Sequence, residues 1–201
     1  MLEMDNCIVY IHGKGGNVEE SFFYKQFFPD HDVIGFDYKS QIPWDAVEEF
    51  SSYFDLLRNK YKSIKIIANS IGAYFVLNAL EGAQIEKAYF ISPIVDMEKL
   101  INDMMQWAGV TELELKEKRV IETSFGEILS YDYLEWVREH PISWTVPTVI
   151  LYGSNDNMQT IGTIKIFTNK FGADLTVMED GEHWFHTKEQ MRFIAEWIRR
   201  N

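Results

Sequence analysis

The sequence has little cysteine: Cys7 is the only one among 201 residues, which excludes a disulfide within the chain. It lies in the apolar run Cys7–Ile11, where a buried core thiol is the common role and a catalytic one is not expected. No apolar run approaches the roughly 20 residues needed to cross a bilayer. The first residues also lack the basic stretch and apolar stretch of a secretory signal. We therefore expect a cytoplasmic protein without a membrane span.

Basic residues are scarce as well. Nineteen Lys and Arg residues stand against 31 Asp and Glu residues, for a formal net charge of −12. Such a surface repels phosphate backbones and anionic membranes, so we expect no nucleic-acid partner. It also disfavours anionic substrates. Internal repeats and low-complexity tracts are absent, and the length suits one domain over residues 1–201.

Short apolar runs alternate with longer amphipathic stretches along most of the chain. The predicted strands are Cys7–Ile11, Asp32–Asp37, Ile64–Ala68, Lys87–Ile91, Thr148–Tyr152 and Asp174–Met178. The predicted helices are Trp44–Lys60, Ile71–Glu81, Ile161–Phe171 and Thr187–Arg199. This order predicts the α/β class, with a mostly parallel sheet of about six strands covered on both faces.

Between about residues 94 and 145 this alternation stops. Two or three helical stretches are predicted there, without a convincing strand. One stretch contains Met104, Met105 and Trp107, and another runs from Ile128 to Val137. The aromatic residues of this insertion are expected mainly to pack against other residues.

Ligands of parallel sheets bind beyond the carboxyl ends of the strands, so the residues directly after each strand matter most. The first strand is followed by the glycine-rich segment His12–Asn17. The dinucleotide pattern fails because Val18 stands where a glycine is needed, and the Walker pattern fails because Gly15 follows Lys14. The remaining interpretation is a loop whose backbone N–H groups face a developing oxyanion.

The third strand is followed by Ala68-Asn69-Ser70-Ile71-Gly72, one residue off the G-x-S-x-G nucleophile elbow. An elbow presents a serine hydroxyl at the top of the sheet and needs small residues two positions before and after it. Both positions here are small. The N–H of Ile71 would point into the site from a helix N-terminus. In the alternative interpretation, Ser70 only caps the helix that follows, and the pentapeptide alone does not separate the two.

An acid and a histidine follow later strands, in the order Ser70, Asp156, His183. A serine hydroxyl is a weak nucleophile until a base takes its proton. Histidine titrates near neutrality and can also return that proton to a leaving group. A carboxylate fixes the imidazole tautomer and stabilises the imidazolium ion. The three residue types together predict nucleophilic catalysis.

Two other acids and a metal site are alternatives to this assignment. Asp180 is close to His183 in sequence, but a turn role is expected for it. Asp96 follows the fourth strand and ranks second as the acid. His183 and His186 with Asp180 suggest metal ligands, but no second ligand cluster accompanies them, so no metal is expected.

With these features the chain resembles the α/β-hydrolase family from Ile8 to Trp197. The resemblance implies a three-layer α/β-hydrolase fold with no cofactor and with a helical lid at about 94–145. It also implies roles for individual residues: Ser70 as nucleophile, Asp156 as orienting acid, His183 as base, and the N–H groups of Lys14 and Ile71 as the oxyanion hole. The chain departs from the family pattern in two ways: Ala68 replaces the first elbow glycine, and the antiparallel edge strands common in the family are missing.

These predictions lead to a functional hypothesis. The chain is expected to be a serine hydrolase that cleaves small-molecule carboxylic esters or thioesters through an acyl-Ser70 intermediate. An apolar or uncharged acyl group is expected, because some aromatic residues of the insertion could line an acyl pocket and the surface is acidic. The alternative is a non-catalytic ligand-binding or interaction protein on the same fold. A nucleotide-binding protein is disfavoured by the failed phosphate motifs, and the sequence does not predict an oligomeric state.

Overall fold

The computed structural model describes residues 4–201. These residues divide into two compact units. The first comprises the residues up to Val95 together with Ser143–Asn201, and the second is Asp96–Ile142. In the described part of the chain, no helix combines the length and apolarity that a membrane crossing needs.

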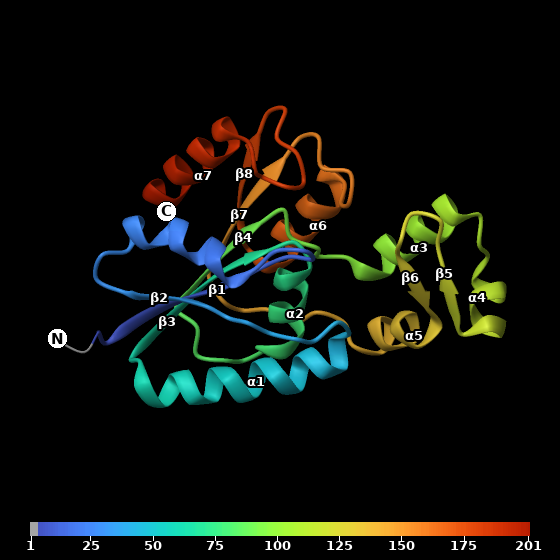
Figure 1. Cartoon of the computed structure of the whole chain (residues 1–201), viewed down its shortest axis with the longest axis horizontal. Coiled ribbons are helices and arrows are strands. Elements are labelled where there is room, and N and C mark those ends of the chain that lie inside the picture. Colours follow the sequence, from blue (N-terminus) through green and yellow to red (C-terminus); the bar gives the residue numbers. More distant parts are fainter. Residues whose placement is uncertain (1–3) are drawn as a thin grey trace. The chain divides into compact units, whose positions relative to one another are not determined.

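The first unit is built on a six-stranded sheet in which every strand pair is parallel (Figure 1). Its strands are β1 (Asn6–Ile11), β2 (Asp32–Gly35), β3 (Ser63–Asn69), β4 (Lys87–Ile91), β7 (Thr148–Gly153) and β8 (Asp174–Met178), in the order β2-β1-β3-β4-β7-β8. The predicted six-stranded parallel sheet is therefore confirmed. The chain leaves β1 toward β2 and then crosses back to β3, so the topological switch point lies between β1 and β3. Ligands of open parallel sheets bind at such a point.

Helices join the strands and cover both faces of the sheet. They are the 3-10 helix η1 (Val18–Phe27), α1 (Pro43–Lys60), α2 (Ile71–Ala79), α6 (Ile161–Phe171) and α7 (Lys188–Arg200). Helices η1 and α7 lie on one face and α1 and α2 on the other (Figure 1). The sequence predicted the four α-helices closely, whereas η1 was not predicted.

The strands contribute alternate side chains to two apolar layers, as the pleat requires. On the η1 and α7 face, Ile8 and Tyr10 of β1 belong to one buried cluster with Tyr24 and Trp197. On the other face, the rings of Phe50 and Phe75 lie 6.1 Å apart. Two buried layers hold the sheet from both sides and fix where its carboxyl ends lie.

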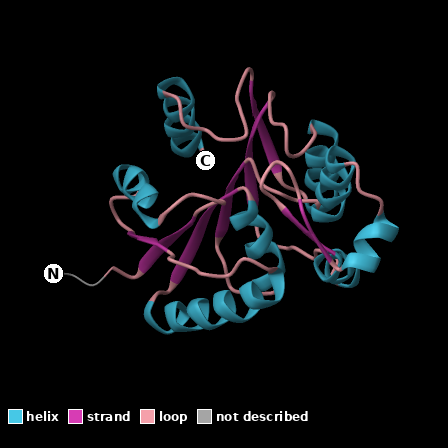
Figure 2. Ribbon diagram, turned by 45° about the vertical axis from the view of Figure 1, so that its right-hand side comes forward, coloured by secondary structure: helices cyan, strands magenta, loops and turns pink. Residues whose placement is uncertain are grey.

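The second unit contains three helices and a hairpin (Figure 2). Its elements are α3 (Met97–Ala108), α4 (Glu112–Lys118), β5 (Val120–Glu122), β6 (Ile128–Ser130) and α5 (Tyr131–Glu139). The helices were predicted, but the antiparallel β5-β6 pair was not, and the prediction that Ile128 begins a helix is wrong. Each strand has three residues, and Val120 and Ile128 are exposed, so no buried alternation marks the hairpin. The role of this unit as a lid stays a prediction.

Candidate active site

The site is centred on a strained backbone turn between β3 and α2. Ser70 has φ 50° and ψ −122°, a region that residues with a side chain rarely adopt. The turn is held by the Ser70 N–H, which donates to the Ile91 carbonyl at 3.1 Å, and by the Ser70 carbonyl, which accepts from Ala73 N at 3.1 Å. The Ser70 side chain makes no capping hydrogen bond to α2, so the capping interpretation is wrong.

Small residues around the turn are required by close backbone contacts. A Cβ on Gly72 would lie 2.4 Å from the His12 carbonyl oxygen. A Cβ on Gly13 would lie 3.0 Å from the Ser70 Cβ. Ala68 is fully buried, so its methyl group is accommodated where the family pattern has glycine. The loop after β1 therefore packs directly against the serine turn.

Asp156 and His183 follow β7 and β8 and meet Ser70 at the carboxyl end of the sheet. His183 Nε2 lies 2.8 Å from Ser70 Oγ, and His183 Nδ1 lies 2.8 Å from Asp156 Oδ2. With Nδ1 donating to the carboxylate, Nε2 is left to accept from the serine hydroxyl. The Asp156 side chain is 0% exposed and that of His183 is 18% exposed. The structure therefore brings together the three residues that the sequence singled out.

The second oxygen of Asp156 is also engaged. Oδ1 accepts from the backbone N–H groups of Met158 at 2.8 Å and Gln159 at 3.2 Å. A buried carboxylate needs such donors to offset its lost hydration. These bonds fix the carboxylate plane and thereby the ring of His183.

The loops that carry the acid and the histidine are in direct contact at two glycines. A Cβ on Gly153 would lie 2.3 Å from the Gly181 carbonyl oxygen. That oxygen accepts from Asn155 N at 2.8 Å. This close approach sets the separation between Asp156 and His183.

The competing residues have other partners. Asp180 has φ 56°, and its N–H donates to Ser154 Oγ at 2.8 Å, which fits the predicted turn role. Asp96 caps α3 by accepting from Lys99 N at 2.9 Å. His186 Nδ1 lies 2.6 Å from the Trp184 carbonyl oxygen. Within residues 4–201, no three His, Cys, Asp or Glu side chains are grouped as metal ligands.

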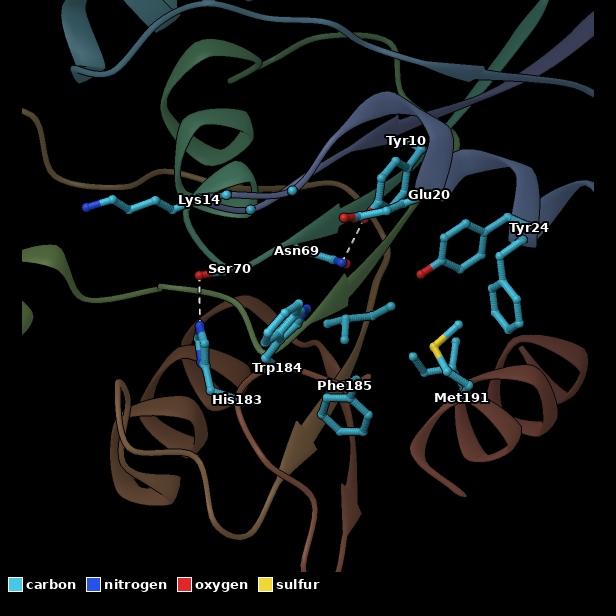
Figure 3. Close-up of a pocket in the computed structure, with 16 residues that line it drawn as sticks. Tyr10, Lys14, Glu20, Tyr24, Asn69, Ser70, His183, Trp184, Phe185 and Met191 are labelled. Carbon is cyan, nitrogen blue, oxygen red and sulfur yellow. Dashed lines mark hydrogen bonds between the residues drawn. The ribbon is translucent and has the colours of Figure 1, made fainter. Parts of the chain in front are cut away.

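A cavity of about 450 Å³ opens beside Ser70 (Figure 3). Its apolar lining comes from Phe23, Tyr24, Phe185, Met191 and Ile194. The segment Gly13–Gly16, which includes Lys14, lines it as well. This volume falls in the range of small-molecule sites.

Three polar residues that line this cavity, Tyr10, Glu20 and Asn69, were not predicted as site residues from the sequence. The Tyr10 hydroxyl donates to the Glu20 carboxylate and contacts Asn69 Nδ2 at 2.9 Å. Burial raises the pKa of the Tyr10 hydroxyl well above its usual range, so it stays protonated and can donate. One sequence signal was present for Glu20: it stands three residues after Asn17, the spacing of a capping box at the start of a helix.

A parallel sheet with a serine on the turn after a central strand, and an acid and a histidine after later strands, defines the α/β-hydrolase class. The chain has the α/β-hydrolase fold. No family model matches the sequence, and a search of curated proteins finds no match.

Solved structures show the same fold. Est1E from Butyrivibrio proteoclasticus is 15% identical with a TM-score of 0.73, over 98% of this chain and 86% of that one. Alpha/beta hydrolase domain-containing protein 10 from mouse is 15% identical with a TM-score of 0.71, over 96% and 88%. A lipase-esterase related protein from Clostridium acetobutylicum is 14% identical with a TM-score of 0.62, over 98% and 95%. Since a fold hosts many functions, the activity has to be argued from the site.

Proposed function

We propose that this chain is a serine hydrolase that cleaves carboxylic esters, with thioesters as a related substrate, through an acyl-Ser70 intermediate. One observation carries the proposal: two successive 2.8 Å contacts lead from Asp156 through His183 to Ser70, which sits on a strained turn. Binding alone needs no base on a serine. Such an arrangement raises the nucleophilicity of a hydroxyl.

In the acylation step, Ser70 Oγ attacks the ester carbonyl carbon while His183 Nε2 takes the hydroxyl proton. Asp156 stabilises the imidazolium ion that forms. The tetrahedral intermediate collapses, the bond to the alcohol oxygen breaks, and His183 donates its proton to that oxygen. The alcohol leaves and the acyl group stays on Ser70.

In the deacylation step, a water molecule takes the place of the alcohol. His183 accepts a proton from the water as its oxygen attacks the acyl carbon. Collapse of the second tetrahedral intermediate breaks the bond to Ser70 Oγ, and His183 returns the proton to that oxygen. The carboxylic acid leaves and the enzyme is restored.

The backbone N–H groups of Lys14 and Ile71 are proposed to stabilise the oxyanion of both intermediates. Ile71 is the first residue of α2, and the first N–H groups of a helix have no partner within it. Lys14 follows Gly13, which packs against Ser70. Donors placed before the reaction need no reorganisation as the charge develops.

The substrate is proposed to be a small-molecule ester with an apolar acyl chain. Aromatic and aliphatic side chains, among them Tyr24 and Phe185, line the cavity beside Ser70. Burial of each methylene group in such surroundings contributes about 0.8 kcal/mol. The length of acyl chain that the enzyme prefers therefore measures the depth of this cavity.

The first experiment compares hydrolysis of a chain-length series of p-nitrophenyl esters by wild type, Ser70→Ala and Ser52→Ala. Ser52 is exposed on α1 and serves as the matched control. We expect Ser70→Ala to lose at least about 10³-fold in kcat, because the nucleophile is gone. We expect Ser52→Ala to match wild type.

Equal activity of wild type and Ser70→Ala would contradict the proposal. The alternative function, a binding protein without catalysis, predicts no turnover by any variant. A fluorophosphonate probe separates the two, because it labels an activated serine and leaves an unactivated one unmodified. Labelling of wild type and Ser52→Ala, with none of Ser70→Ala, is the expected result.

A further inference from the structure

Asn69, which lines the cavity beside Ser70, carries a buried hydrogen-bond acceptor without a donor. The single proton of the Tyr10 hydroxyl is used on Glu20, so the contact with Asn69 has to have Asn69 Nδ2 donating. This sets the orientation of the Asn69 amide, in which Nδ2 faces Tyr10 and Oδ1 is the remaining polar atom. Oδ1 is buried, and no group in the described part of the chain donates to it. A buried acceptor left without a donor is destabilising.

The Glu20 carboxylate adds a charge to the same cavity. Its Oε1 accepts from Asn17 N at 3.3 Å, and its other oxygen accepts from Tyr10. Two bonds use about half of the lone-pair sites of a carboxylate. Among residues 4–201, no Lys, Arg or His pairs with Glu20. A negative group in a cavity with apolar walls favours a cationic ligand.

The neighbours of Glu20 keep this charge available. A Cβ on Gly16 would lie 3.0 and 3.2 Å from the two carboxylate oxygens, so the glycine provides their space. Lys14 lines the same cavity, but its ammonium group points away from Glu20 (Figure 3). The rings of Tyr24 and Trp184 also line the cavity, and aromatic faces attract cations.

The donors of a primary ammonium match the remaining lone pairs of the Glu20 carboxylate. It carries three N–H groups and a positive charge, whereas an alcohol carries one O–H group and no charge. A carboxylate ligand would be repelled and would offer no donor. The apolar walls suit the carbon chain between the ammonium and the reacting carbonyl.

We propose that this cavity binds substrates that carry a protonated primary amine, received by the Glu20 carboxylate. The inference rests on the proposed function, since it names a class of ester for the same site. It also departs from the prediction from the sequence: the acyl chain stays apolar, but its far end carries a positive charge instead of being uncharged.

The test is calorimetric titration with n-pentylamine, which is protonated at neutral pH, and with 1-pentanol. Three proteins are compared: wild type, Glu20→Gln and Glu19→Gln. Glu19 is the neighbouring exposed residue, so its variant has the same change in net charge outside the cavity. Glutamine also serves in a capping box, so Glu20→Gln retains the start of η1.

We expect wild type to bind the amine about tenfold more tightly than the alcohol, or more, as a charged hydrogen bond provides. Glu20→Gln should bring this ratio close to one, and Glu19→Gln should keep the wild-type ratio. Equal affinities in wild type overturn the inference, as does a ratio that survives in Glu20→Gln.

Binding needs no turnover, so the same titrations of Ser70→Ala separate this inference from the proposed function. An amine preference in Ser70→Ala with unchanged ester hydrolysis would remove the catalytic proposal and keep this one. A second readout compares kcat/KM for p-nitrophenyl 6-aminohexanoate and p-nitrophenyl hexanoate. Wild type should favour the amino ester, and Glu20→Gln should lose that preference.

Discussion

At the scale of single residues, Ser70 is held in a conformation that costs free energy. Its φ of 50° with ψ of −122° suits glycine, whereas a Cβ makes the turn strained by about 1–3 kcal/mol. The strain persists because hydrogen bonds to Ile91 and Ala73 hold the turn from both sides. The hydroxyl is thereby presented to His183 instead of to the helix that follows.

This strain predicts a stability difference between two inactive variants. Ser70→Gly should be more stable than Ser70→Ala by about 1 kcal/mol or more, because glycine adopts the turn without a Cβ clash. Urea denaturation followed by circular dichroism measures the free energies of unfolding. At the exposed helical position Ser52 the order should reverse, with Ser52→Gly less stable than Ser52→Ala by about 1 kcal/mol. The same order at both positions would argue against strain at Ser70.

Some residues of the site could be predicted from the sequence and others could not. Ser70, Asp156 and His183 each lie in the segment that follows a strand, and each is a residue type that the chemistry needs, so their order along the chain points to them. Tyr10 lies inside β1 and Glu20 inside η1, and the capping-box spacing of Glu20 predicts the start of a helix but no role in a site. They meet only because η1 packs over the face of the sheet that Tyr10 belongs to.

At the scale of elements, burial explains which strands could be predicted. All six residues of β7 are buried, and such continuous apolar runs are typical of parallel strands covered on both faces. The hairpin β5-β6 has three residues in each strand, and too few of them are buried to give a pattern. Helix η1 lacks a 3.6-residue apolar period, since only Ser21 and Tyr24 of its ten residues are buried.

The contact between the loops after β7 and β8 predicts the effect of one methyl group. Gly153→Ala puts a Cβ within 2.3 Å of backbone at Gly181, so the two loops have to separate. We expect a loss of about 1–3 kcal/mol in stability. We also expect kcat to fall by at least about tenfold, because a displacement of about 1 Å can cost about 10²-fold.

The matched control is Gly162→Ala in α6. Its Cβ would meet only Thr160 Oγ1 at 3.6 Å, an ordinary contact. Alanine in a helix should stabilise the protein by up to about 1 kcal/mol and leave kcat unaltered. Thermal unfolding and ester hydrolysis of both variants check the pair. A fully active Gly153→Ala protein would mean that the two loops tolerate displacement.

At the scale of the whole molecule, the net charge of −12 acts on every charged substrate. Its field reaches far into solution at low ionic strength and is screened by salt. The Glu20 carboxylate acts at short range inside the cavity, where screening is weaker. The two contributions should therefore respond differently to salt.

This difference in salt response predicts the kcat/KM of wild type for an anionic ester. The kcat/KM for mono-p-nitrophenyl glutarate should be lower than that for p-nitrophenyl pentanoate at low salt. Raising the salt from about 10 mM to about 1 M shortens the Debye length from about 30 Å to about 3 Å and should narrow this gap without closing it. Glu20→Gln should remove most of the difference in kcat/KM that remains at high salt. A ratio that salt does not alter would exclude a contribution from the net charge.

The distance along the chain between Ser70 and His183 has a consequence for the newly made protein. The two residues are separated by 113 positions. At roughly 5–20 residues per second, a ribosome adds the histidine roughly 6–23 seconds after the serine. Throughout this interval the nascent polypeptide carries a serine that has no base to activate it. On the proposed function, an unfinished chain therefore cannot be acylated prematurely by cellular esters, and reactivity arises only once the loop after β8 has been translated.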